Sequence, residues 1–272
     1  MNDIPSQNTG LLIGRRPSDY MGAELPYELR NKTGDWRKFL PVGEKQRPDA
    51  VDVMGCVTFS ALSILEIQHI FQTGKEVNFS DRFTAKMSGT THDGNWLYKV
   101  ADSIRNDGVV WEKDYQTPAN FSWDSYYAEI PQEVRTRAFK IIDKDNSVGW
   151  VFKKDFAYHL KQTPLHITIP EPYPNHAVVL VHISGDTGYY FDSYSPFLKT
   201  IKMSQISDAA QKIIYNAKPM LNVTTINIDG TIYVAHELND PKDIPYANKF
   251  LGSNLVQNPD GTIPTDIHAT KK

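Results

Sequence analysis

The sequence has a single cysteine among its 272 residues, so no disulfide can form within the chain. No apolar run approaches the roughly 18 to 20 residues that a membrane-spanning helix needs. The net charge is only -3 and the charges are interspersed, so nothing indicates a surface for nucleic acid. No glycine-rich phosphate loop follows a strand pattern, and no cysteine and histidine cluster has the spacing of a zinc site. We therefore expect a soluble globular protein with no metal, cofactor, membrane contact or nucleic-acid partner.

The N-terminus lacks a basic segment followed by an apolar stretch, so it does not predict a secretory signal. A chain with one cysteine does not depend on an oxidising compartment for its stability. We expect folding in the cytoplasm. Packaging into a virion, or release by cell lysis, would leave no mark in the sequence.

Polarity divides the sequence into three parts. Residues 1–45 are polar and rich in proline, glycine and arginine, which predicts an arm over the surface. Residues 46–236 carry the periodic patterns of a folded domain, and residues 237–272 are again polar and predict a peripheral tail. Within the central part we expect a helical lobe at about 50–145 and a β lobe at about 146–236.

Helical patterns come first in the central part and strand patterns follow. Apolar residues recur at helical spacing from Gly55 to the C-cap glycine Gly74, and again over Asn95–Asp107 and Gln132–Asp143. Strands are predicted at Pro164–Ile169, His176–Ile183 and Tyr189–Asp192, and at Val223–Ile228 and Thr231–Ala235 around an Asp-Gly hairpin turn. This order indicates an α+β fold with a functional cleft between the lobes.

The lone Cys56 stands at the predicted start of the first helix. A thiol in that position sees the positive end of the helix macrodipole, which favours the nucleophilic thiolate. Gly55 before it allows another backbone to approach the sulfur closely. The alternative interpretation is an inert, buried small side chain.

His176 begins the most apolar predicted strand, directly after a proline-rich loop. Burying an imidazole at that position costs folding free energy unless the ring is hydrogen-bonded or has a function. Facing a cleft, it can act as the base for a thiol. The alternative is a hydrogen-bonded histidine at the rim of the sheet.

Asp192 ends the returning strand of the same predicted hairpin. Its carboxylate can therefore reach one ring nitrogen of His176, which sets the tautomer and leaves the other nitrogen for the sulfur. The alternative is a turn residue, because aspartate before Ser-Tyr-Ser-Pro is also good turn chemistry.

The chain resembles the papain-like cysteine peptidases over roughly residues 25–197. The resemblance rests on the stretches GCVTFSALSILE, GNWLYKVADSIRNDGVVWEKDY, NHAVVLVHI and YYFDSYSP, preceded by LPYELR and LPVGEKQ. It implies a two-lobed fold with a helical left lobe, an antiparallel β-sheet right lobe and the active-site cleft between them. A disulfide-free chain of this kind resembles microbial or phage-type members.

The resemblance also implies roles for individual residues. Cys56 matches the nucleophile and His176 the general base that later becomes the acid. Asp192 stands where the family usually has an asparagine that orients the histidine. The implied activity is hydrolysis of a peptide bond through an acyl-enzyme on Cys56.

Gln46 is the best match to the glutamine that forms the oxyanion hole together with the backbone N–H of Cys56. It lies ten residues before Cys56, farther than the family pattern has it. The family's shielding tryptophan is absent, and Tyr194 is expected to take its place. Gly55, Tyr194 and Asn175 are the residues we expect to contact the substrate.

Two other functions remain open at this stage. The same Cys-His-Asp order serves transglutaminase-like acyl transfer and peptidoglycan-directed amidases or endopeptidases, so a bacterial cell-wall peptide is an alternative to a protein substrate. The fold could also persist as a non-catalytic structural or binding module, for example in a phage particle, because fold constrains function weakly.

Overall fold

The computed structural model describes residues 11–12, 30–48, 51–142, 148–170, 175–215, 222–228, 231–237 and 270–271. The chain divides into two units, Met1–Asn216 and Ala217–Lys272. All the residues singled out above for catalysis or substrate binding belong to the first unit.

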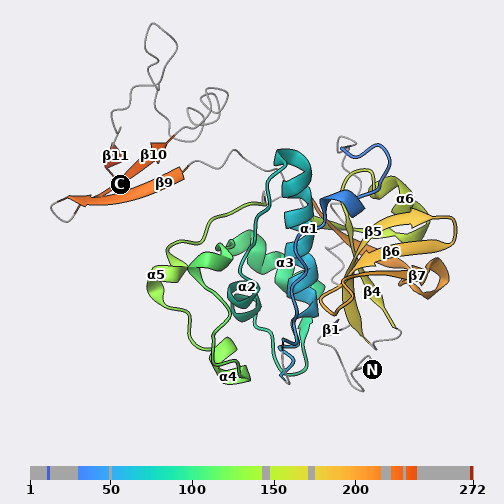
Figure 1. Cartoon of the computed structure of the whole chain (residues 1–272), viewed down its shortest axis with the longest axis horizontal. Coiled ribbons are helices and arrows are strands. Elements are labelled where there is room, and N and C mark those ends of the chain that lie inside the picture. The colour runs from blue at the N-terminus through green and yellow to red at the C-terminus, as the bar shows by residue number, and fades with distance from the viewer. Residues whose placement is uncertain are drawn as a thin grey trace, which may run out of the picture. The chain divides into compact units, whose positions relative to one another are not determined.

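A long central helix, α1 (Cys56–Thr73), organises the first unit (Figure 1). It begins directly after Gly55 and ends at Gly74, whose φ of 70° suits a glycine and whose N–H donates to the carbonyl oxygen of Ile70. Both predicted ends are thereby confirmed. The helix is buried on nearly all sides because α2 and α3 pack on one face and strand β5 packs on another.

The remaining helices are short. They are α2 (Asp81–Met87), α3 (Leu97–Asn106), α4 (Trp123–Tyr126), α5 (Gln132–Arg135) and α6 (Phe156–His159), with 3-10 turns η2 (Arg37–Phe39), η3 (Glu112–Asp114), η4 (Lys153–Asp155) and η5 (Met203–Gln205). The helix predicted over Gln132–Asp143 is wrong in length, because α5 stops at Arg135. Phe139 instead exchanges two backbone hydrogen bonds of 3.0 Å with Val109, which draws the chain out of the helix.

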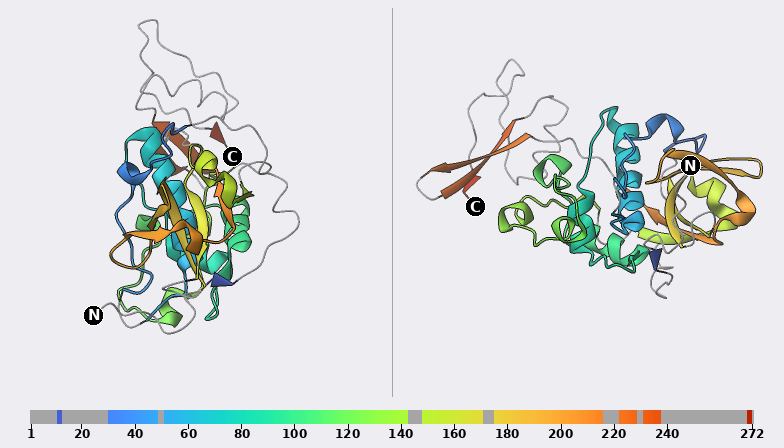
Figure 2. Two further views of the ribbon diagram at one scale, coloured as in Figure 1. Left: turned by 90° about the vertical axis from the view of Figure 1, so that its right-hand side faces the viewer. Right: turned by 60° about the horizontal axis from the view of Figure 1, so that its bottom comes forward.

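An antiparallel sheet of six strands forms the other side of the unit (Figure 2). Its order is β3-β8-β4-β5-β6-β7, with β3 (Val148–Phe152), β4 (Leu165–Ile169), β5 (His176–Ser184), β6 (Thr187–Phe191), β7 (Leu198–Lys202) and β8 (Ala209–Ile213). The predicted strands β4, β5 and β6 are confirmed, and the α+β class with them. The first six residues of β5 are buried, as its apolar sequence predicts.

The register of the β5–β6 hairpin places the candidate site. Ser184 lies opposite Thr187 and Val179 lies opposite Phe191, so the chain turns at residues 185–186. His176, at the start of β5, and Asp192, just after β6, therefore lie at the same end of the sheet.

Parts of the first 45 residues are packed into the core of this unit. β1 (Leu11–Leu12) pairs in parallel with β2 (Asn95–Trp96). Trp36 is 0% exposed, and its indole N–H donates to the carbonyl oxygen of Leu160 at 2.6 Å.

In the second unit, β9 (Asn222–Ile228) pairs with β10 (Thr231–Glu237), and β11 (Thr270–Lys271) pairs with β10. Ile228 lies opposite Thr231, which confirms the predicted hairpin. Most of the predicted tail over 237–272 lies outside the described residues.

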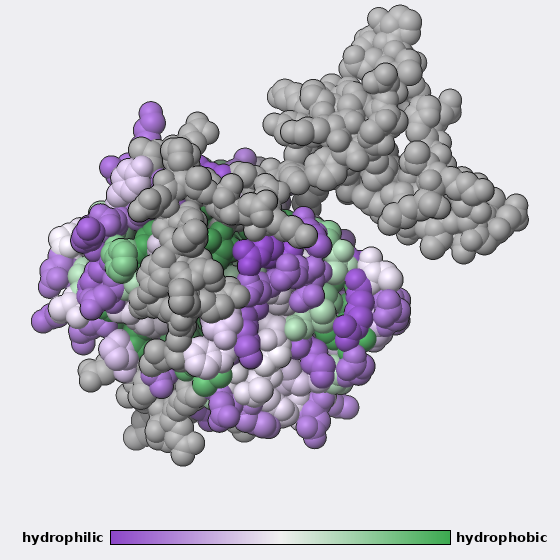
Figure 3. Space-filling model, turned by 180° about the vertical axis from the view of Figure 1, so that it is seen from behind, coloured by the Kyte–Doolittle hydropathy of each residue, from purple (hydrophilic) through white to green (hydrophobic). Residues whose placement is uncertain are grey.

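On the part of the surface that Figure 3 shows in colour, hydrophilic residues predominate, with smaller hydrophobic areas between them. The exposed large hydrophobic side chains are Val42, Phe152, Tyr158 and Leu198. None of the described helices has the length and apolar character that crossing a bilayer demands.

Candidate active site

Cys56 is the first residue of α1, and its side chain is 0% exposed. Gly55 forms the N-cap, and a Cβ there would lie 3.1 Å from the ring of Phe59 and 3.3 Å from Val53. The glycine is therefore needed for the packing of Phe59 one turn along the helix, rather than for the approach of a second backbone.

The surroundings of the thiol favour its neutral form in this structure. Burial raises the pKa of Cys56, and the negative charges of Asp52 and Asp192 add to that effect. Backbone hydrogen bonding to Ala177 and Val57 acts in the opposite direction. Because Ala177 follows His176, the same contact places the sulfur beside the start of β5.

A buried imidazole–carboxylate pair lies at that end of the sheet. Nε2 of His176 donates to Oδ1 of Asp192 at 2.6 Å, and both side chains are completely buried. The bond uses the nitrogen at the far end of the ring, so Nδ1 is the nitrogen that can serve a thiol.

Lys199, on β7, supplies a cation to this pair. Its Nζ donates to Oδ2 of Asp192 at 2.7 Å, and the backbone N–H of Tyr194 donates to Oδ1. Burial acts to raise the pKa of Asp192, but His176 and Lys199 together outweigh it, so the pKa is lowered. No local pattern in the sequence indicates a role for Lys199, because its position depends on the pairing of β7 with β6.

Tyr194 packs beside the histidine. The centroids of the two rings are 5.2 Å apart, and the ring planes are tilted by 42°. The hydroxyl of Tyr194 donates to Oδ2 of Asp52 in a very short contact. Burial and the neighbouring Asp52 both raise the pKa of Tyr194.

Gln46 is buried in the same network. Its Nε2 donates to Oδ1 of Asp52 at 2.9 Å and to the hydroxyl of Tyr194 at 2.8 Å, and its Oε1 accepts from Ser193 at 2.7 Å. The side-chain amide of Gln46 is thus tied to the loop around Asp192. Asp52, which also accepts from the backbone of Met54, is a second residue that sequence reasoning missed.

Backbone strain is concentrated at the same place. Among the described residues, the non-glycine residues with positive φ are Met54 (53°) and Asn175 (54°). One lies two residues before Cys56 and the other directly before His176. Such conformations have a cost and tend to occur where function requires a particular geometry.

The N-terminal segment also reaches this site. The backbone N–H of Leu11 donates to the carbonyl oxygen of Asn175 at 3.2 Å, and the Leu11 side chain is only 2% exposed. Through β1 the same segment pairs with Asn95–Trp96 in the helical lobe. An extended stretch of chain therefore lies beside the candidate histidine.

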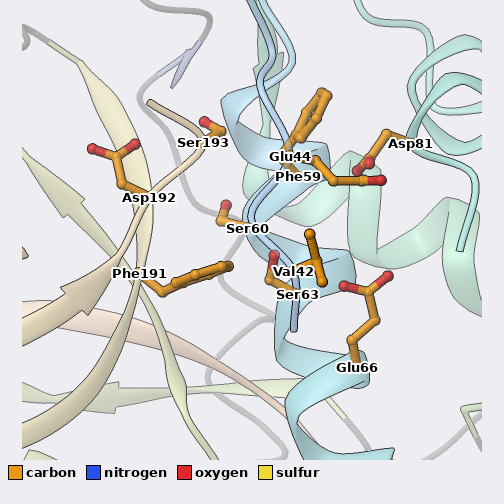
Figure 4. A pocket seen from close by; sticks show the side chains of 10 residues that line it. All are labelled: Val42, Glu44, Phe59, Ser60, Ser63, Glu66, Asp81, Phe191, Asp192 and Ser193. Carbon is orange, nitrogen blue, oxygen red and sulfur yellow. The ribbon is translucent and has the colours of Figure 1, made fainter. Parts of the chain in front are cut away.

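Beside Asp192 is a small cavity of about 10 Å³, room for about one water molecule (Figure 4). Asp192 and Ser193 line one side. Glu44, Glu66 and Asp81 line the other, and Figure 4 shows Glu44 and Asp81 close together.

No protein-family model and no curated protein matches the sequence. Solved structures do match. A cysteine protease of ragweed pollen, Amb a 11 in its proform, has 17% identity and a TM-score of 0.51 over 73% of this chain and 70% of its own. Procathepsin L 3 from Tenebrio molitor larval midgut has 16% identity and a TM-score of 0.51 over 76% of each chain. The Carica candamarcensis protease CMS1MS2, in complex with E-64, has 16% identity and a TM-score of 0.50 over 67% and 98%.

These identities establish the fold and nothing finer. The predicted papain-like, two-lobed α+β fold is confirmed.

Proposed function

We propose that the protein hydrolyses peptide bonds with Cys56 as the nucleophile. The observation that carries the proposal is the buried His176–Asp192 pair, 2.6 Å apart, at the end of the sheet where the backbone of Ala177 meets the Cys56 thiol. A buried charge lowers the stability of a fold, so a papain-like protein with no use for this pair would keep it at the expense of stability.

The chemistry follows from the positions of the groups. Sγ of Cys56 gives its proton to Nδ1 of His176 and attacks the carbonyl carbon of the substrate. His176 then gives that proton to the departing amine, which leaves an acyl group on the sulfur. A water molecule gives a proton to His176 and attacks the thioester, the C–S bond breaks to release the acid, and His176 returns the proton to Sγ of Cys56. Asp192, neutralised by Lys199, holds the ring in one orientation throughout.

The oxyanion of each tetrahedral intermediate needs donors near the sulfur. The first turn of α1 provides backbone N–H groups that have no acceptor within the helix, including that of Cys56. We propose that the substrate oxygen replaces Asp52 or Tyr194 as an acceptor of the Gln46 amide. Gln46 then becomes a side-chain donor to the oxyanion.

A substrate strand has to take the place now occupied by Leu11. The carbonyl oxygen of Asn175 and the edge at Asn95–Trp96 already bind an extended backbone there. The same groups would hold a peptide by adding it as a strand. Asn175 is therefore proposed to bind the substrate backbone, with Gly55 and Tyr194 bordering the reacting atoms.

The direct test is cleavage of a mixture of unrelated peptides, followed by mass spectrometry. We expect products from the wild-type chain and none from Cys56→Ser or His176→Ala. Asp192→Asn, which restores an amide, is expected to retain part of the activity. Products that persist in Cys56→Ser would refute the assignment of the nucleophile.

A second candidate is a non-catalytic binding module. The specific observation in its favour is the complete burial of Cys56 with a raised thiol pKa. It predicts no cleavage by any variant and a Cys56→Ala protein that binds its peptide partner as the wild type does.

A further inference from the structure

A second, larger cavity lies on the helical lobe. Its volume is about 420 Å³, and Val53 and Phe59, on either side of Cys56 in the sequence, form part of its wall. We call it the acidic recess, because the carboxylates of Glu44, Asp81 and Glu112 line it. It meets the small cavity beside Asp192 at Glu44, Phe59 and Asp81.

Among the described residues, no ion pair joins a lysine or arginine to the carboxylates of the recess, and Arg82 acts on Glu112 only as a nearby charge that lowers its pKa. Glu44 accepts from the amide of Asn78 and Glu112 from the backbone of Thr117, both neutral donors. The nearby Arg82 gives its guanidinium to the carbonyl oxygens of Gln116, Ser125 and Tyr126 instead. Lys45, the cation that lines the recess, has an exposed side chain.

Two residues that line the recess each have a buried polar atom with no hydrogen-bond partner. One is Oδ1 of Asp81, whose residue is 6% exposed and whose carboxyl group interacts with that of Glu44. The other is the hydroxyl of Tyr126, whose residue is 1% exposed. Leaving such groups unsatisfied is costly, so each calls for a ligand that donates hydrogen bonds.

We propose that the acidic recess binds a lysine or arginine side chain of a peptide. The carboxylates of Asp81 and Glu112 and the hydroxyl of Tyr126 accept from its ammonium or guanidinium group. The aromatic walls, Phe59, Phe121 and Tyr126, suit the aliphatic stem and the face of the cation. A bare metal ion fits less well, because the described residues contain no group of three or more His, Cys, Asp or Glu side chains placed to hold one.

The empty recess is expected to hold protons that the ligand displaces. Burial raises the pKa of Glu112 to about 7, and it raises the pKa of Asp81 strongly. The charged or titratable groups that face these carboxylates are Glu44 and Lys45 from the preceding loop, Arg82 on α2 and Tyr126 on α4. Because a bound cation favours the carboxylate forms, binding should release protons and tighten as the pH rises.

The test uses n-butylguanidinium and its neutral isostere n-butylurea as probes, since neither contains a peptide bond. The result is therefore independent of the proposed catalytic activity. Isothermal titration calorimetry of the full chain at about pH 8 should show butylguanidinium binding at least about tenfold more tightly than butylurea. The preference should shrink at about pH 5.5, with proton release seen as a dependence of the measured enthalpy on the buffer.

Glu112→Gln and Asp81→Asn should each reduce the preference for butylguanidinium by at least about fivefold. Glu133→Gln, an exposed carboxylate on α5, is the matched control and should leave it unchanged. Unchanged melting temperatures show that the variants are folded. Equal binding of the two probes, a preference that survives both substitutions, or displacement of butylguanidinium by millimolar Mg²⁺ would each overturn the proposal.

Discussion

At the residue scale, the site depends on how the charge of Asp192 is balanced. The carboxylate is completely buried, with the imidazole of His176 on one oxygen and the ammonium of Lys199 on the other. An asparagine, which the resemblance would place here, needs no such cation. The aspartate and the lysine are therefore best understood as one unit.

Removing the lysine should expose this dependence. Lys199→Met leaves a buried carboxylate without its cation and should lower the free energy of unfolding by about 3 kcal/mol. Asp192→Asn in the same chain should recover most of that loss, because it removes the charge. Urea unfolding measures both, with Lys202→Met on the exposed side of β7 as the control. An equal loss in the control would show that only the strand was weakened.

The residues of the site differ in how visible they are in the sequence. Cys56, His176 and Asp192 each stand at the boundary of an element with a clear pattern, so their chemistry could be predicted from local order. Asp52 and Lys199 could not, because Asp52 reaches the site through the path of the loop before α1 and Lys199 through the register of β7 against β6. Their roles appear only when the loop before α1 and the edge strand β7 are placed.

At the element scale, α2 shows why some helices were missed. Its seven residues are too few for a clear period, and it depends on one buried cap. The hydroxyl of Ser80 accepts from the backbone of Phe83 and donates to the carbonyl oxygen of Tyr115. The strands β3, β7 and β8 were also missed. In β8, for example, the polar side chains of Gln211 and Lys212 are buried along with the apolar residues, so its sequence does not show the pattern of a buried strand.

Ser80→Ala should therefore be costly for so small a change. It removes a helix cap and leaves a buried carbonyl without its donor, and we expect a loss of about 2 kcal/mol. Ser122→Ala, which removes the exposed cap of α4, is the matched control and should cost less than about 1 kcal/mol. Thermal unfolding distinguishes the two. Similar losses would mean that the buried contact to Tyr115 contributes little.

The strand β1 lies beside the candidate histidine through its bond to Asn175, and we expect it to limit access to the thiol. Leu11→Asp places a charge in a buried position and should release the strand from Asn175. We expect iodoacetamide to modify Cys56 at least about tenfold faster in this variant than in the wild type. Phe152→Asp, at an exposed hydrophobic position on β3, is the control and should leave the rate unchanged.

At the scale of the whole molecule, buried carboxyl groups with raised pKa values make the stability of the fold depend on pH. Burial raises the pKa of Glu66 to about 8 in the folded chain, against about 4.3 when unfolded. The folded state therefore binds more protons between these values, and stability falls as the pH rises from about 4 to about 8.

Glu66→Gln should remove the part of this pH dependence that Glu66 contributes. Glutamine can still accept the hydrogen bond from the backbone of Phe79, now 2.9 Å long, but has no proton to lose. We expect the free energy of unfolding of the variant to exceed that of the wild type by on the order of 3 kcal/mol at about pH 8, and to equal it near pH 4. Melting temperatures across this range measure the effect, with Glu133→Gln as the control. A constant difference at every pH would contradict the account.

The central claim is that the fold brings Cys56 and His176 together as a reactive pair, and alkylation of the thiol tests it most directly. Because the chain has a single cysteine, the mass gained after iodoacetamide treatment reports on Cys56 alone. In the Leu11→Asp background at about pH 6.5, we predict that Cys56 reacts faster than free cysteine, and that adding His176→Ala removes the advantage. A thiol that reacts no faster than free cysteine once β1 is released, or one that is indifferent to His176, would contradict the account.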